Sequence, residues 1–131
     1  MSNLPTKLRL GAILLFSFVV LNRDGSRDES ATVGNVNMSL EDVTDKDGNP
    51  IDPNLFATFE EVSEDVDKAT ITSDEAFDGA TGTFVGTTTV SWPNPVEGGD
   101  PITKELRAVG TATLAADPSA GDTLEMVVTL Q

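Results

Sequence analysis

The chain of 131 residues contains no histidine, no cysteine and no tyrosine. The absence of histidine removes the commonest general base, and the absence of cysteine removes thiolate nucleophiles, disulfides and sulfur ligands for zinc. Serine catalysis of the usual kind needs a histidine, and the chain has no Gly-x-Ser-x-Gly motif. Hydroxyls, carboxylates, four lysines and four arginines remain for chemistry. We therefore expect that the protein is not an enzyme and that it binds no cofactor.

Carboxylates are the one class of reactive side chain that clusters. Glu60, Glu64 and Asp67 fall on one face of a predicted helix, whereas catalytic carboxylates face each other across a cleft in unlike environments. The run 45–52, DKDGNPID, differs from a calcium loop because its glycine stands at the fourth position and not at the sixth. We expect a tight turn there, with weak cation binding at the acidic segment 41–78 as the alternative.

Basic residues are scarce, since 22 acidic residues stand against 8 basic ones and the net charge is −14. Residues 1–23 hold three bases and no acid (+3), whereas residues 24–131 hold five bases and 22 acids (−17). The strongly acidic segment 24–131 would repel the phosphate backbone of a nucleic acid, so we expect no specific nucleic-acid binding. The excess of aspartate over glutamate and of valine over isoleucine, with little lysine, is typical of a halophilic or marine protein. An ordinary acidic protein is the alternative.

One apolar run stands out, at residues 10–21 (LGAILLFSFVVL). Its twelve residues fall short of the about 20 that a transmembrane helix needs, so we expect no membrane span. The basic residues before it suit an uncleaved leader, although no small-x-small cleavage site follows, and a buried helix is a further alternative. We favour one long, fully buried strand, bulged at Gly11 and closed by an Asp24-Gly25 turn.

Residues 53–68 have the pattern of an amphipathic helix. Asp52 is a suitable N-cap, and Pro53 is a suitable first residue because it has no N–H to lose. The pair Glu64 and Lys68 has i,i+4 spacing. Apolar residues recur at helical intervals through this segment, at Leu55, Phe59, Val62 and Val66.

The remainder predicts β-strands, at about 36–41, 69–72, 83–92, 103–116 and 124–130. The last two form a C-terminal hairpin around the turn 117–122. Without alternating βαβ order, these elements predict a mainly β fold, an antiparallel β-sandwich or partly open barrel of about six strands with one helix. We divide the chain into a basic N-terminal arm, 1–9, and a single β-rich domain, 10–131. The inward residues of 103–116 are expected to be Leu106, Ala108, Gly110, Ala112 and Leu114.

A strand that is apolar on both faces needs cover on both sides, which a single small domain does not supply. We therefore expect sibling molecules to cover it, with the basic arm and the acidic body in head-to-tail contact. This favours a structural subunit of a repetitive assembly, most of all a virion protein of the capsid-accessory, decoration or tail-tube type. Its partners would be copies of itself or other structural proteins of that assembly, not a small molecule. The candidate interface residues are Lys7, Arg9, Leu14, Phe16, Phe18 and Trp92.

Two other functions stay open. One is an immunoglobulin-like binding or adhesion module that uses the loops 93–101 and 117–122. The string 43–51, VTDKDGNPI, is similar to strand-to-strand turns in the immunoglobulin-like repeats of bacterial adhesins and phage surface proteins. The other is a subunit of an extracellular, pilus-like filament. Both would place the protein outside the cell or at its surface, and not in a virion.

Overall fold

The computed structural model describes residues 6–117, 119–124 and 126–130. The fold is mainly β, as predicted, and its long strands form two sheets. The elements in chain order are β1 (Thr6–Arg9), β2 (Ile13–Ser17), β3 (Thr32–Val33), β4 (Asn37–Thr44), α1 (Pro53–Phe56), β5 (Ala57–Ser63), β6 (Val66–Ile71), the 3-10 turn η1 (Glu75–Phe77), β7 (Thr81–Trp92), β8 (Ile102–Ala115) and β9 (Val127–Leu130).

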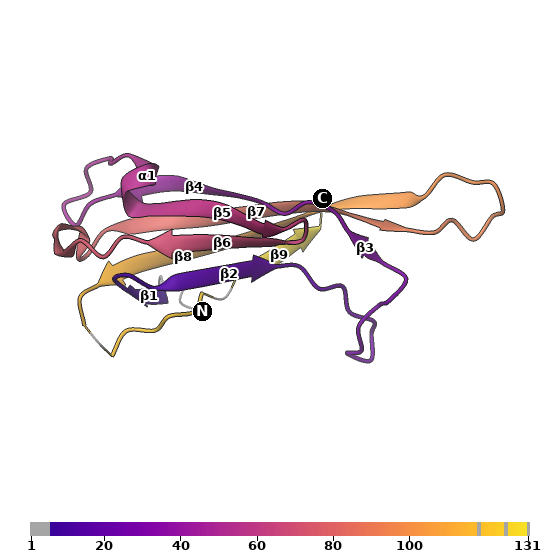
Figure 1. The fold of residues 1–131 in the computed structure, drawn as a ribbon, viewed down its shortest axis with the longest axis horizontal. Helices are drawn as coiled ribbons and strands as arrows, with labels where there is room; N and C mark the ends of the chain where they lie inside the picture. Colours follow the sequence, from indigo (N-terminus) through magenta and orange to yellow (C-terminus); the bar gives the residue numbers. More distant parts are fainter. Residues whose placement is uncertain (1–5, 118, 125, 131) are drawn as a thin grey trace.

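The large sheet is built on the long antiparallel hairpin of β7 and β8 (Figure 1). On the far side of β8, β1 pairs in parallel with its C-terminal end and β9 pairs antiparallel with residues nearer its start. On the far side of β7, β4 and β3 pair with successive parts of the strand, both antiparallel. Each long strand is therefore flanked by two short strands placed end to end.

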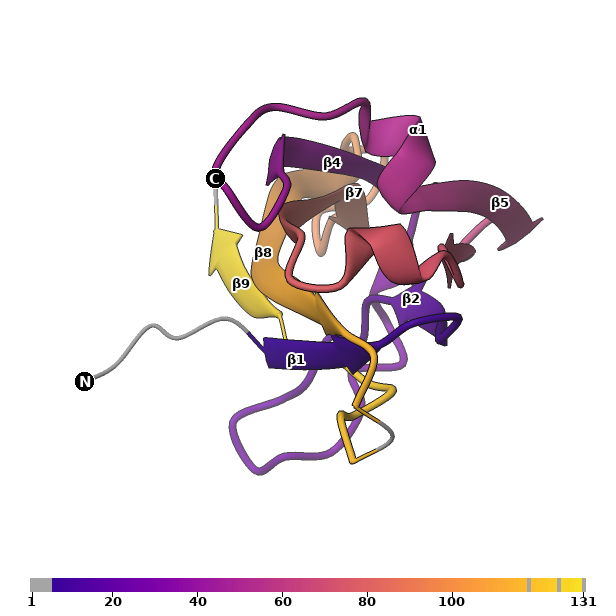
Figure 2. The ribbon, with the colours of Figure 1, turned by 90° about the vertical axis from the view of Figure 1, so that its left-hand side faces the viewer.

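The small sheet has the order β2-β6-β5, is antiparallel throughout and covers one face of the large sheet. Viewed from the end, the large sheet curls around the core and the small sheet closes it (Figure 2). Phe84 of β7 is fully buried at the centre, with its ring centroid 5.6 Å from that of Phe16, 6.1 Å from that of Phe56 and 6.0 Å from that of Phe59. The core thus joins both sheets around one aromatic cluster.

The predicted single strand over residues 10–21 is wrong. The chain reverses at Gly11, which has a φ of +80°, so that β1 joins the large sheet and β2 joins the small sheet. A glycine suits this corner because a side chain is strained at positive φ. The basic residues of 6–9 therefore lie on a strand of the sandwich. The predicted turn at Asp24-Gly25 is present, with Gly25 at a φ of +90°.

The predicted helix over 53–68 is wrong beyond its first turn. Asp52 caps α1 as expected, accepting the N–H of Asn54, but the helix ends at Phe56 and residues 57–71 form the β5–β6 hairpin. Glu60 stands directly opposite Lys68 across the two strands, and their charged groups are 3.1 Å apart. Lys68 is therefore paired across the sheet and not with Glu64 along a helix.

The predicted strand over 103–116 is confirmed as β8. Its five expected inward residues are buried, and they alternate with half-buried ones along the strand. The predicted C-terminal hairpin is only partly right, because β9 pairs with residues 106–109 and leaves the end of β8 to β1. Position 125, within the strand expected at 124–130, lies outside the described residues.

Candidate functional site

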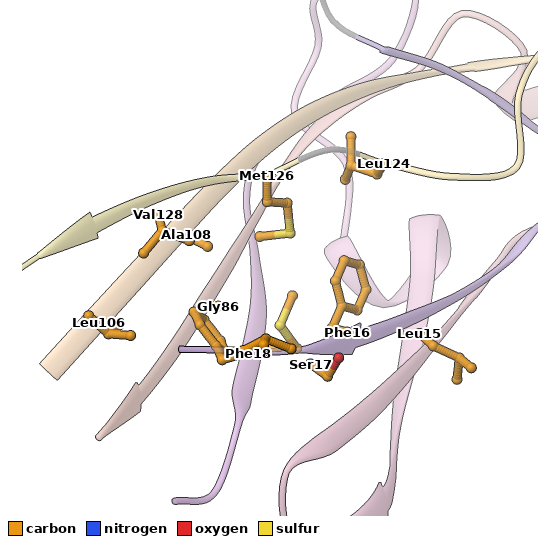
Figure 3. Close-up of a pocket in the computed structure, with 12 residues that line it drawn as sticks. Leu15, Phe16, Ser17, Phe18, Gly86, Leu106, Ala108, Leu124, Met126 and Val128 are labelled. Atoms are coloured by element: carbon orange, nitrogen blue, oxygen red, sulfur yellow. The ribbon is translucent and has the colours of Figure 1, made fainter. Parts of the chain in front are cut away.

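An apolar groove runs between β2 of the small sheet and β8 and β9 of the large sheet, and we call it the β2 groove (Figure 3). Three adjoining hollows of about 240, 480 and 350 Å³ make it up. The first shares Val19, Leu106 and Val128 with the second, and it shares Leu15, Phe16 and Leu124 with the third. The groove is therefore continuous from the start of β2 to the point where β7 ends and β8 begins.

Apolar side chains form both walls of the groove. Figure 3 shows Phe16 and Phe18 on the β2 side, with Met126 and Leu124 of the C-terminal segment facing them. The groove is deep at its floor because β7 and β8 carry small residues there, Gly86 and Ala108. Among the lining residues described, charge is confined to Lys104 and Asp122 near opposite ends. Such a surface suits an apolar occupant better than a charged or strongly polar one.

The strands that border the groove have unpaired edges. In the described part of the chain, β2 pairs with β6 alone and β9 pairs with β8 alone. An unpaired edge presents backbone N–H and C=O groups that can accept another strand. Proteins usually protect such edges with charged residues or proline, but β2 has the sequence ILLFS.

The outer face of β2 and of the segment after it is also apolar. Ile13 is 59% exposed and Leu15 is 68% exposed, while Val19 and Leu21 farther along are also more than half exposed. Four aliphatic side chains are thus exposed along one short segment, with the exposed Ser17 between Leu15 and Val19.

The predicted interface residues are divided by the alternation of the strands. Lys7 and Arg9 are exposed on β1, whereas Leu14 and Phe16 point inward and are buried in the core of their own domain. Phe18 is half-buried and lines the β2 groove. The exposed residues of the run are thus the ones between those that were predicted. Successive side chains of a strand point to opposite faces, and this alternation could have predicted which residues of the run are buried and which are exposed. The composition does not show the difference because both faces are largely apolar.

Trp92, the remaining predicted interface residue, is half-buried at the end of β7, next to the loop that leads to β8, and it lines one end of the groove. Its indole N–H donates to a carboxylate oxygen of Asp28 at 2.9 Å. Hydrogen bonds from Ser30 and from Trp92 hold the pKa of Asp28 below its usual range. This contact fastens the loop 22–31 to the hairpin.

The hairpin of β7 and β8 extends past the ends of the other strands (Figure 1). We call the part between Trp92 and Ile102 the arm. Asn94 braces it, since its side-chain amide donates to the carbonyl oxygen of Asp100 at 2.9 Å and its Oδ1 accepts the backbone N–H of Val96 at 2.9 Å. Three prolines restrict the backbone further, at positions 93, 95 and 101. The arm therefore presents Val96, which is 67% exposed, on a braced support.

The acidic residues do not converge on a chemical site. The segment 45–52 forms a turn in which the Asp45 carboxylate accepts the backbone N–H groups of Asp47 and Asn49, and these bonds lower the pKa of Asp45. Over the residues described, no three histidine, cysteine, aspartate or glutamate side chains gather as a metal site would require. Glu60, Glu64 and Asp67 belong to the β5–β6 hairpin and not to one helical face.

Asp67 is the one buried carboxylate described. Burial, followed by repulsion from Glu61 directly across the hairpin, raises the pKa of Asp67 above its usual range. Glu61 lies beside it on the neighbouring strand of the same sheet, and Phe16 lies beside it on β2, so within the described residues no second carboxylate faces Asp67 across a cleft.

In the described segments, no helix is long and apolar enough to cross a membrane. No protein-family model, no curated protein and no solved structure matches the chain.

Proposed function

We propose that this protein is a non-enzymatic structural subunit of a repetitive assembly. The observation that supports the proposal is the apolar outer face of β2, with its unpaired strand edge beside the β2 groove. Exposure of these aliphatic side chains to water is unfavourable, and their burial against another subunit would favour association.

The size of this surface can be compared with the cost of association. Full burial of an aliphatic side chain contributes about 1.5–3 kcal/mol, so four that are somewhat over half exposed contribute roughly 4–7 kcal/mol. Association costs about 4–15 kcal/mol in lost rigid-body freedom and side-chain ordering. The outer face of β2 alone gives a weak pair. Stable association therefore requires the groove to be filled as well, or each copy to make contacts on more than one side, as in a repetitive assembly.

Among such assemblies we favour a virion, in which the chain would serve as a capsid-accessory, decoration or tail-tube protein. The acidic body supports this choice because it repels nucleic acid and does not trap it. A pilus-like extracellular filament uses the same surfaces and is the alternative within the class.

A binding or adhesion module is less well supported. The loops 93–101 and 117–122 follow opposite ends of β8, a strand of 14 residues that spans about 45 Å at 3.3 Å per residue. Loops at opposite ends of a sandwich do not form one ligand surface (Figure 1).

Light scattering on size-exclusion fractions, over a wide range of protein concentration, tests the proposal, with electron microscopy of the concentrated material. We expect mass to rise with concentration and ordered particles to form. Leu15→Glu should reduce the association, whereas Val62→Glu, which adds the same charge at a 57% exposed position on β5, should not. A chain that stays monomeric at every concentration would refute the proposal.

A further inference from the structure

We propose that two copies of the chain pair through β2, edge to edge and antiparallel, so that their small sheets join. This inference rests on the proposed function and identifies one contact of the assembly. β2 forms the border of the small sheet, whose order is β2-β6-β5 (Figure 1). Pairing with β2 of a second copy joins the three strands of each molecule into one continuous sheet.

The backbone of β2 has hydrogen-bonding groups that point away from its own sheet. The carbonyl oxygen of Ala12, just before the strand, accepts the N–H of Ile71 on β6 at 2.9 Å. In an antiparallel pair, residues whose backbone groups face the partner strand alternate with residues whose groups face away from it. Residues 14 and 16 therefore face β6, and residues 13, 15 and 17 present their N–H and C=O groups at the free edge. Within the described part of the chain, these outward groups have no hydrogen-bond partner.

The free edge of β2 is complementary to itself. In an antiparallel pair centred on Leu15, this residue stands opposite Leu15 of the second copy, and Ile13 of either copy stands opposite Ser17 of the other. Each of these pairs exchanges two hydrogen bonds, so the backbone groups that are free in one molecule are satisfied in the pair. Opposite residues lie on the same face of a sheet, so the exposed Ile13 and Leu15 side chains of the two copies also come together.

Charge favours β2 over the other free edges of the molecule. Of the described strands with five or more residues, β2, β4 and β5 lie at the edge of a sheet. β4 carries Glu41 and Asp42, β5 carries Glu60 and Glu61, and each strand has a shift of register beside these residues. Acidic side chains and an irregular register protect an edge from pairing. β2 has no charge and an unbroken register with β6, so a second β2 meets it without repulsion between like charges.

The β2 groove lies beside the same edge, and the antiparallel arrangement brings the grooves of the two copies against each other. Their walls are apolar, so contact removes both surfaces from water. The charged lining residues described, Lys104 and Asp122, lie near opposite ends of the groove. Because the two copies run in opposite directions, the Lys104 end of each groove lies toward the Asp122 end of the other. Opposite charges placed in this way favour the antiparallel orientation.

The symmetry of this contact fixes its size. Both copies use the same surface, so the contact is isologous and closes after two copies. The pair is then the unit from which a repetitive assembly grows, through contacts on other surfaces of the molecule.

Disulfide trapping tests the pairing and its register, because the unaltered chain contains no cysteine. Opposite Cα atoms of a hydrogen-bonded pair lie about 5.5 Å apart, within the range that a disulfide spans. Leu15→Cys should therefore form a linked dimer under mild oxidation, and so should an equimolar mixture of Ile13→Cys and Ser17→Cys. Ile13→Cys alone should link about tenfold less, because the two copies of residue 13 lie four positions apart, about 13 Å at 3.3 Å per residue. Non-reducing electrophoresis measures the linked fraction, and Val62→Cys, at another exposed position, measures random collision.

A charge exchange at position 15 tests the same pairing in solution. Leu15→Lys alone and Leu15→Glu alone should each associate about tenfold or more weakly than the unaltered chain, because like charges then stand directly opposite each other. Their equimolar mixture should recover a one-to-one pair, since position 15 of one copy faces position 15 of the other. Light scattering on size-exclusion fractions measures the association. The Leu15 side chain is 68% exposed, so neither change disturbs the core.

Results that contradict the pairing can be distinguished from failure of the proposed function. Linkage of Ile13→Cys alone as strong as that of Leu15→Cys would mean a parallel pair or another register, and it would overturn the proposal. If the unaltered chain associates but Leu15→Cys links no better than Val62→Cys, or the charge-exchange mixture stays monomeric, another surface makes the contact and the proposed function stands without this pair. If the unaltered chain never associates at any concentration, both proposals fail together.

Discussion

The two faces of β2 can be separated by a pair of substitutions at adjacent leucines. Leu14 is 4% exposed and belongs to the core, whereas Leu15 is 68% exposed on the outer face. Leu14→Ala should lower the free energy of unfolding by about 2–5 kcal/mol, since it removes buried methyl groups and leaves a cavity. Leu15→Ala, measured on dilute protein, should change it by no more than about 0.5 kcal/mol. Urea denaturation followed by the fluorescence of Trp92, the single tryptophan, measures both.

Protein concentration adds a second contrast to this pair. A contact between copies stabilises the folded state by mass action, so the unaltered chain should become harder to unfold as its concentration rises. Leu15→Ala should lose most of that gain, whereas Leu14→Ala should keep its dependence on concentration although its stability is lower throughout. The deficit of Leu15→Ala therefore appears only in concentrated protein.

Equal losses for the two variants in dilute protein would refute the reasoning. That result would mean that both faces of β2 are covered within one molecule. Leu15 would then be buried in the monomer and not exposed, and the proposed assembly would lose its main support. Urea m-values that stay equal among the variants would show that the comparison concerns stability and not a change in the unfolded state.

Three further changes test the fold around the site. Phe84→Ala should cost about 3–5 kcal/mol in urea denaturation, because the fully buried ring contacts both sheets. Asp67→Asn should raise the free energy of unfolding at neutral pH. Because the pKa of Asp67 is raised in the folded state, its stabilising contribution is fully present below the unfolded-state pKa and is lost as pH rises through the folded-state pKa. Urea denaturation at a series of pH values should therefore show that the advantage of the asparagine variant disappears in acid. Asp28→Ala should shift the emission of Trp92 to the red as the indole loses its partner, whereas Asp24→Ala in the same loop should not.

The longer strands of the large sheet, β4, β7 and β8, were predictable because local pattern and tertiary role agree, whereas the short strands β1 and β3 were not predicted. In β8 buried residues alternate strictly with half-buried ones from Leu106 to Ala115, and turn residues bound both ends of the strand. The pairing of β9 was less predictable, since a strand of four residues can meet several parts of a longer one. Its choice depends on β1, which is distant in sequence and occupies the end of β8.

The helix over 53–68 failed for a physical reason. The capping signal at Asp52 and Pro53 was real and does start a helix, but a good start does not fix the length. Apolar residues at helical spacing also satisfy a two-residue period in part, and Ala57, Phe59 and Val62 occur in a strand whose partner, β6, supplies Lys68 opposite Glu60. Cross-strand pairing overrode a local preference worth a few tenths of a kcal/mol.

The site itself required the fold, because its parts come from opposite ends of the sequence. Nothing in the order of residues places Leu15 beside Leu124 or shows that the chain turns at Gly11 from one sheet to the other. Before the corner is known, twelve apolar residues predict one strand buried on both faces. Once it is known, the same residues give a strand with one buried face and one exposed face.

The outer face of the large sheet can be compared with the outer face of β2. On the outer face of the large sheet, β7 and β8 carry threonines that pair across the strands, Thr81 with Thr113 and Thr83 with Thr111, each with hydroxyl oxygens 3.1 Å apart. At the equivalent outer positions of β2 stand Ile13 and Leu15. Threonine also favours strands and exposes less apolar area than isoleucine or leucine, so strand formation alone does not explain why Ile13 and Leu15 occupy these positions. The contact between subunits proposed above would account for them, because it would remove these exposed aliphatic side chains from water.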